Sequence, residues 1–273
     1  MLNKKVTLGV GTIGNTEALC LCLNSVLSGS VLPARIVVRS EGSFPSINNF
    51  NLEQLSELAR IKGVEFLIAV IKSKGAREGC DWTMNNCHTP FLWLVDDDVV
   101  FEHRALEELL KGSDHAAEIG PWGFVCGNKR DVNNRRGYGD FGQEELDAHV
   151  AIKDYCSTNL YYSEEGGQVI VKCMALDTGH VLLNVDTLRF KGLGFAYFKE
   201  DFNCGGYDTF FGIRCTHSGF PGYFAHRSKC WHLEKQRQNF GEFSQRKAYL
   251  LRSAEAVGIT DPSLASKIFN WVK

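Results

Sequence analysis

The feature that most constrains this chain is an apolar run, FLWLV at 91–95, followed at once by Asp96, Asp97 and Asp98. A run that is apolar at every position is typical of a strand that helices cover on both faces of its sheet. The three aspartates then fall at the carboxyl end of a central strand. Because open α/β sheets bind their ligands beyond the carboxyl ends of their strands, a functional site is expected there.

The residues around this run alternate between strand-like and helix-like segments, which is typical of βαβ units around a mostly parallel sheet. Short β-rich runs predict the strands, and apolar residues at helical spacing predict the helices. Strands are expected at 6–10, 35–39 and 64–71, and helices at 16–27, 51–61, 76–87 and 102–111. Asn51 and Gln54 are expected to form a capping box for the second helix, and Gly112 to end the fourth.

After the fourth helix the pattern is looser. Residues 127–142 read as a polar loop that carries Lys129, Arg130, Arg135 and Arg136. The segment 168–185 is rich in strand formers, 195–222 is aromatic and punctuated by glycine, and the residues from 240 onward predict two helices. Since no repeat, low-complexity tract or linker interrupts the chain, we expect one domain in two parts.

The composition excludes several classes of protein. With 273 residues, 44% of them hydrophobic and 23% charged, the chain is neither disordered nor fibrous and can bury a core without disulfides. Its formal charge of −2 provides no overall field for nucleic acid or anionic membrane. The ten cysteines include no CxxC pair, and neither an export signal nor an apolar run of about 18 residues is evident. We therefore expect free thiols, no transmembrane segment and a cytoplasmic location.

Three adjacent carboxylates repel one another unless a positive group lies among them. A divalent cation is the expected partner of the aspartates, and a solvated turn is the alternative. In an extended segment Asp96 and Asp98 point to the same side, so that one can meet a sugar hydroxyl while the other binds the metal.

Several ordered motifs resemble a known family. The segments VTLGVGTIGN, CLNSVLSGSVLPARIVVRSEGS and PFLWLVDDDV are similar in order and spacing to the nucleotide-sugar half of GT-A glycosyltransferases, particularly family 2, and EDFNCGGYDTFFGIRCTHSGF is similar to a stretch of its far half. The likeness runs from Val6 to about Lys235. It implies an α/β fold of GT-A type, with a Rossmann-like, mostly parallel central sheet flanked by helices. Residues 1–112 would form the nucleotide-sugar-binding half and 113–273 a mixed acceptor-binding and catalytic half.

The resemblance also implies roles for single residues. Asp208 matches the catalytic base of inverting members, and His232, 13 residues after Gly219, matches a metal-binding histidine that would act with Asp98. The nucleotide sugar would be held by Thr12, Asn15, Glu41, Arg77, Asp96 and Asp97. The segment 177–180 matches the floor under the donor sugar and acceptor.

The sequence departs from the family pattern at three places. Ser40 and Glu41 stand where two aspartates usually hold the base and ribose, and Tyr207 replaces the first acid of a Glu-Asp pair. The usual Ala-Arg-Asn before the metal-binding strand is absent, and Gly75, Ala76 and Arg77 stand a few residues earlier.

The chemistry of glycosyl transfer agrees with these assignments. A carboxylate-held Mn²⁺ or Mg²⁺ neutralises the leaving diphosphate, and a set that includes an imidazole suits Mn²⁺ better. Asp208 could take the acceptor's proton, and its alternative role is that of a helix N-cap. His180, His217 and His226 are expected to be ordinary core or surface histidines, and Trp93 a core residue.

The sequence thus predicts a metal-dependent, inverting glycosyltransferase with a nucleoside diphosphate sugar, a UDP-sugar first, as donor. A glycan, a lipid-linked sugar, a protein or a modified nucleic-acid base remains open as acceptor. A GT-A-like nucleotidyltransferase and a non-catalytic nucleotide-sugar-binding scaffold are the alternatives. The first normally carries a glycine-rich loop with Arg and Lys after its first strand, which GVGTIGNTE lacks, and intact Asp98, Asp208 and His232 argue against the second.

Overall fold

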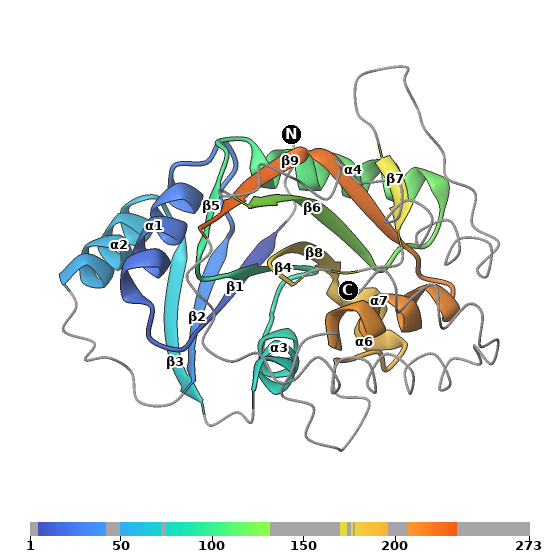
Figure 1. Cartoon of the computed structure of the whole chain (residues 1–273), viewed down its shortest axis with the longest axis horizontal. Helices are drawn as coiled ribbons and strands as arrows, with labels where there is room; N and C mark the ends of the chain where they lie inside the picture. Colours follow the sequence, from blue (N-terminus) through green and yellow to red (C-terminus); the bar gives the residue numbers. More distant parts are fainter. Residues whose placement is uncertain are drawn as a thin grey trace.

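The computed structural model describes residues 5–41, 50–71, 75–131, 170–173, 176, 178–195 and 207–233. Within these residues, strands and helices form one α/β fold around a single mixed sheet (Figure 1). The strands are β1 (Val6–Thr12), β2 (Arg35–Glu41), β3 (Glu65–Ile71), β4 (Phe91–Asp96), β5 (Val99–Phe101), β6 (Phe124–Asp131), β7 (Ile170–Cys173), β8 (His180–Asn184) and β9 (Gly222–His232). The helices are α1 (Thr16–Leu27), α2 (Phe50–Ile61), α3 (Ala76–Asn85), α4 (Ala105–Ile119), α6 (Val185–Phe190) and α7 (Tyr207–His217).

One half of the sheet is parallel, as the sequence predicts. Its strands follow the order β3-β2-β1-β4, and α1, α2 and α3 form the connections between them. Every strand of this half ends toward the same edge, so Thr12, Glu41 and Asp96 terminate β1, β2 and β4 side by side. The carboxyl ends of β1 and β4 therefore border the three aspartates.

The other half of the sheet is mixed. Strand β8 pairs antiparallel with both β4 and β6, whereas β6 pairs parallel with β9. Strand β9 also pairs antiparallel with β5 and β7, so it joins three other strands. Pairs of this kind connect residues far apart in the sequence, as between Val125 and Tyr223.

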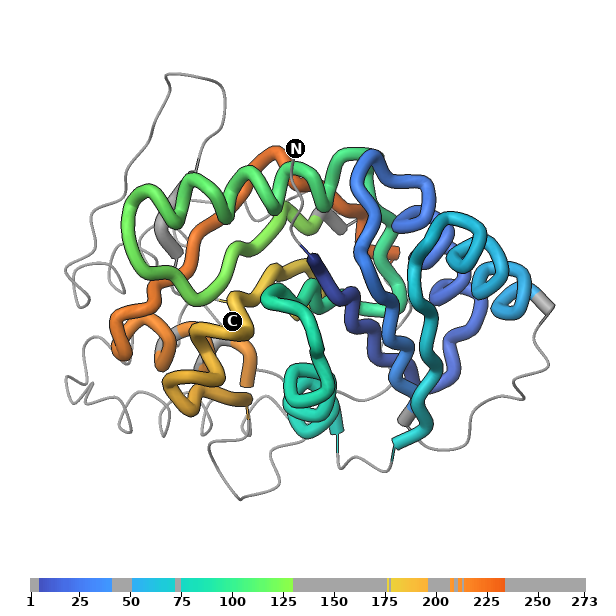
Figure 2. The backbone as a smooth tube through the Cα atoms, turned by 180° about the vertical axis from the view of Figure 1, so that it is seen from behind, coloured from blue at the N-terminus to red at the C-terminus, as the bar shows by residue number. Residues whose placement is uncertain are grey.

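Two hydrophobic clusters cover the two faces of the sheet. One packs α1, α2 and α4 against alternate strand residues such as Trp93 and Val95, and the other packs α3, α6 and α7 against Leu92 and Leu94. The run at 91–95 is thus covered on both faces, and Trp93 is a core residue, both as predicted. Figure 2 shows α4 running along β6 and β9, seen from behind.

Three local predictions are wrong. Helix α4 continues through Gly112 to Ile119, because Gly112 is buried and tertiary packing of the helix outweighs the low helix propensity of glycine. Asn51 lies inside α2 and not before it, so it is no N-cap. Lys129 and Arg130 belong to β6 instead of a loop, because this polar segment pairs with β9.

Some predictions concern residues outside the described ranges. These include Arg135 and Arg136 and the two helices expected after residue 240. In the described part of the chain, every helix is too short or too polar to cross a membrane.

Candidate active site

The acidic segment connects the two halves of the sheet. Asp96 is the last residue of β4, and Asp97 and Asp98 form the turn into β5. Because β5 pairs with β9, Val99 lies opposite His232, and the amide of Leu233 donates a hydrogen bond to the carbonyl of Asp98 at 2.8 Å. Strand pairing therefore brings His232 to the aspartates, as the family resemblance implied.

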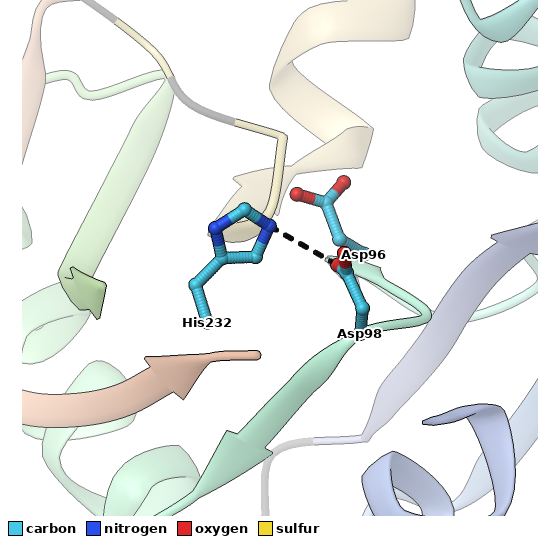
Figure 3. Close-up of side chains that lie close together, drawn as sticks. All are labelled: Asp96, Asp98 and His232. Atoms are coloured by element: carbon cyan, nitrogen blue, oxygen red, sulfur yellow. Dashed lines mark ion pairs between the residues drawn. The ribbon is translucent and has the colours of Figure 1, made fainter. Parts of the chain in front are cut away.

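Asp96, Asp98 and His232 offer ligand atoms that all lie within 4.8 Å of one another. His232 Nε2 lies 3.2 Å from Asp98 Oδ1, and Figure 3 shows the imidazole directed at Asp98 with Asp96 beside it. The histidine is only 3% exposed, so its ring is held in place by its surroundings. Two carboxylates and one imidazole at this spacing suit a first-row divalent cation such as Mn²⁺.

A lysine that the sequence placed in a loop also reaches this cluster. Lys129 on β6 lies 3.2 Å from Asp96 Oδ2, and its side chain is 10% exposed. Local sequence contains no signal for this contact. It arises from the pairing of β6 with β8 and β9, which joins segments far apart in the chain.

Asp97 lies in a different environment from its neighbours. Burial raises its pKa to about 6, and the nearby charges of Asp98 and Asp96 act in the same direction. A hydrogen bond from Thr12 opposes them by favouring the charged form. The Thr12 hydroxyl also accepts a hydrogen bond from the amide of Gly14 at 3.2 Å, so the loop after β1 is tied to the acidic turn.

A cavity of about 140 Å³ opens beside Asp96 and Asp97. Its walls come from β1, β2, α3, β4, the turn before β8 and the start of α7. The polar side chains that line it are Thr12, Arg39, Asp96, Asp97, Thr178 and Tyr207. It therefore lies at the carboxyl edge of the parallel strands, where the sequence predicts the ligand.

Arg39 is the second site residue that sequence reasoning missed. It is 5% exposed, and its Nη1 donates a hydrogen bond to Thr83 Oγ1 at 3.1 Å. Two glycines make room for the guanidinium, because a Cβ at Gly11 or Gly79 would lie 2.1 or 2.3 Å from its atoms. An arginine inside a strand with glycines on the neighbouring elements is a signal that could have found it.

Asp208 lies in the first turn of α7, so it follows the helix start at Tyr207 and is not its N-cap. The Tyr207 hydroxyl lies 3.1 Å from the Thr178 hydroxyl in the cavity wall. Burial chiefly raises the pKa of Tyr207, and the charges of Asp208 and Asp96 add to the effect. The charges of both carboxylates therefore reach the same hydroxyl, and Tyr207 at the start of α7 lines the cavity.

Three further predicted residues are not among the described residues that line the cavity. Asn15 precedes α1 and its carbonyl accepts from the amide of Leu19, while its side chain caps nothing. Glu41 ends β2, and its side chain lies outside the described part. Arg77, on α3, is 8% exposed. Among the described residues, the arginine that lines the cavity is Arg39 and not Arg77.

His180 is a core residue, as expected. It is 1% exposed, its Nδ1 accepts from the Trp93 indole at 3.1 Å, and its Nε2 lies 2.9 Å from Ser228 Oγ. An indole N–H can only donate, so the proton of the neutral ring is on Nε2 and is donated to Ser228. The floor predicted at 177–180 is thus divided, because Thr178 lines the cavity and His180 does not. Asp177 lies outside the described residues.

No protein-family model and no curated protein matches this sequence. Solved structures do. Residues 1–349 of S. aureus TarS in complex with UDP-GlcNAc match with a TM-score of 0.63 and 12% identity over 98% of this chain and 71% of that one. The mannosyltransferase PcManGT from Pyrobaculum calidifontis in complex with GDP-Man and Mn²⁺ matches with a TM-score of 0.62 and 14% identity over 98% of this chain and 68% of that one.

Another structure of S. aureus TarS matches with a TM-score of 0.63, and there this chain covers 43% of the other. At such identities the likeness establishes the fold and nothing finer. The chain has an α/β fold of the GT-A type, as the sequence resemblance implied.

Proposed function

We propose that this GT-A-fold chain is a metal-dependent, inverting glycosyltransferase that moves a sugar from a nucleoside diphosphate sugar to an acceptor hydroxyl. The observation that carries the proposal is the cluster of Asp96, Asp98 and His232 beside a cavity at the carboxyl edge of β1 and β4. Solved structures of the same fold hold UDP-GlcNAc, or GDP-Man with Mn²⁺.

Asp98 and His232 are the proposed metal ligands, and their oxygen and nitrogen atoms fit Mn²⁺, or Mg²⁺ with more bound water. When bound, such an ion neutralises charge on the leaving diphosphate. Asp96 and Asp97 are proposed to face the ribose and diphosphate. Thr12, Asn15, Glu41 and Arg77 are proposed to hold the rest of the nucleotide, with residues 1–112 as the donor half of one compact domain and 113–273 as the acceptor half.

Asp208 is the proposed general base. In an inverting transfer its carboxylate takes the proton of the acceptor hydroxyl while the acceptor oxygen bonds to the anomeric carbon. The bond from that carbon to the diphosphate oxygen breaks on the opposite face. The place of Asp208 in the first turn of α7 supports this role, because the positive end of the helix dipole favours the charged carboxylate.

The donor is proposed to be a UDP-sugar, with a GDP-sugar as the alternative, since the neighbouring structures hold one of each. The acceptor is a hydroxyl of a glycan, a lipid-linked sugar, a protein or a modified nucleic-acid base. A cytoplasmic setting is part of the proposal. It is supported by the seven free cysteines of the described part: Cys20, Cys22, Cys80, Cys87, Cys126, Cys215 and Cys230.

A donor-hydrolysis screen across UDP- and GDP-sugars with Mn²⁺ tests the proposal. We expect one donor to be hydrolysed, the activity to vanish in excess chelator, and Mn²⁺ to restore it. Asp98→Asn and His232→Ala should lose both activity and metal-dependent nucleotide binding, whereas Glu107→Gln on α4, whose partners are Arg104, Lys111 and Ser30, should lose neither. Binding without turnover would favour a scaffold, consumption of nucleoside triphosphates a nucleotidyltransferase, and full activity in chelator would exclude the metal.

A further inference from the structure

Lys129 is a positive group built into the acidic cluster. Its ammonium lies 3.2 Å from Asp96 Oδ2, and only 10% of its side chain is exposed. A lysine that served solubility alone would extend its ammonium into water, since this group is strongly hydrated. The position of Lys129 at the cluster is therefore a feature that needs a role.

The same pair of strands positions Lys129 and His232. On β6, Lys129 lies opposite Cys230 of β9, and Asp131 lies opposite His232 itself. A register shift between Gly127 and Asn128 precedes this stretch, so the polar end of β6 pairs with β9 in a different register from the apolar start of β6. Strand pairing thus fixes the backbone from which the ammonium of Lys129 reaches the cluster.

This placement sets up a competition for Asp96. A divalent ion held by Asp98 and His232 would lie within a few ångströms of the ammonium, and the two positive charges repel each other. Asp96 can neutralise the lysine or ligate the ion. A neutral Asp96–Lys129 pair leaves the ion with Asp98 and His232 as protein ligands.

We propose that Lys129 is a positioning residue that holds the Asp96 carboxylate in an ion pair with no net charge. This ion pair keeps Asp96 from ligating the metal and so weakens metal binding in the absence of nucleotide. This inference rests on the proposed function. The negative oxygens of a bound nucleoside diphosphate would offset the repulsion between the two cations. The metal and the donor therefore bind cooperatively, and the donor completes the metal site.

Calorimetric titration of the full chain with Mn²⁺ alone, without nucleotide, tests this inference. Lys129→Gln leaves Asp96 charged beside the site and should tighten Mn²⁺ binding about tenfold. Asp96→Asn leaves the lysine without its counter-charge and should weaken binding by a similar factor. The double variant removes one charge of each sign and should return to within about threefold of wild type.

Two further variants separate charge from folding. Lys129→Arg keeps the positive charge and should bind Mn²⁺ as the wild type does. Lys111→Gln also removes a lysine that is paired with carboxylates, Glu107 and Glu108, but outside the cluster, and should change nothing. Thermal melting of each variant confirms that the chain is folded.

The outcomes distinguish this inference from the proposed function. If Asp96→Asn and the double variant both lose Mn²⁺ binding about 100-fold or more, Asp96 is itself a ligand and the role of Lys129 is wrong, while the metal site stands. If Lys129→Gln binds Mn²⁺ as the wild type does, the inference is equally wrong. If no variant binds Mn²⁺, Lys129→Gln included, both this inference and the metal-dependent function fail.

Discussion

The two halves of the sheet differ in how they are connected. Strands β1 to β4 are parallel, and one helix lies between each of them and the next along the chain. Strands β5 to β9 pair mostly antiparallel and across long stretches of sequence, and β9 alone joins β5, β6 and β7. The regular half supplies the carboxyl edge of the parallel strands, where the cavity lies. The irregular half brings single side chains to that edge.

The candidate site combines side chains from both halves of the sheet. Asp96 and Asp98 come from the end of the parallel half, whereas Lys129 and His232 come from β6 and β9. The start of α7 adds Tyr207 and Asp208. If this difference matters for function, single side chains from the irregular half should be essential to the chemistry, and the apolar core of the parallel half should contribute more to stability than a single polar contact of the irregular half.

Substitution of Asp208, which α7 brings to the site, should have the largest effect on activity. Asp208→Asn keeps the size and polarity of the side chain but removes the proton acceptor, so transfer should fall by about 10²- to 10⁴-fold while donor binding stays nearly unchanged. Initial rates with the donor from the hydrolysis screen and its acceptor measure the first effect. Calorimetry with the corresponding nucleoside diphosphate and Mn²⁺ measures the second.

The stereochemistry of the product is tied to the same residue. Direct attack assisted by one base inverts the anomeric centre, which proton NMR of fresh product reports. An Asn variant that keeps most of its turnover, or a product that retains the donor's configuration, would remove Asp208 from this role.

The parallel half and the order of its elements could be predicted from the sequence, because each element depends on local periodicity. The all-apolar run at 91–95 indicated a central strand, and its aspartates indicated the ligand edge. His232 could be found only through family resemblance. Lys129 could not be found, because its end of β6 is polar and pairs with β9, which lies far away in the sequence. Gly112 misled because tertiary packing overrode its low helix propensity.

A second prediction tests whether the core of the parallel half carries its stability. Leu23 on α1 is fully buried, and Leu23→Ala should lower the free energy of unfolding by about 2–5 kcal/mol through lost burial and a cavity. Leu21→Ala, on the same helix but 55% exposed, should change it by less than about 0.5 kcal/mol. Urea unfolding followed by circular dichroism measures both, and equal effects would contradict the described packing of α1.

A third prediction concerns the irregular half, where a buried polar contact replaces regular pairing. Ser228 Oγ accepts from His180 Nε2 and donates to the carbonyl of Ala105 at 2.7 Å, so one hydroxyl links β9, β8 and α4. Ser228→Ala leaves the buried imidazole N–H and the carbonyl without this hydroxyl, which should cost about 1–3 kcal/mol. Ser28→Ala, whose exposed hydroxyl bonds to Asn24, is the matched control and should be nearly neutral in the same urea titration.

The smallest expected effect distinguishes one thiol from the rest. Six of the seven free cysteines in the described part are buried in one half or the other, whereas Cys20, on α1, is only partly buried. Burial raises the pKa of the Cys20 thiol as well, but its access to reagent decides the rate. In the native protein without reductant, a chromogenic disulfide reagent should show a fast phase that Cys20→Ser reduces by one thiol equivalent.

After denaturation nearly all ten cysteines should react, because none is expected to be in a disulfide. Several unreactive cysteines under denaturing conditions would instead indicate native disulfides, and with them an oxidising compartment.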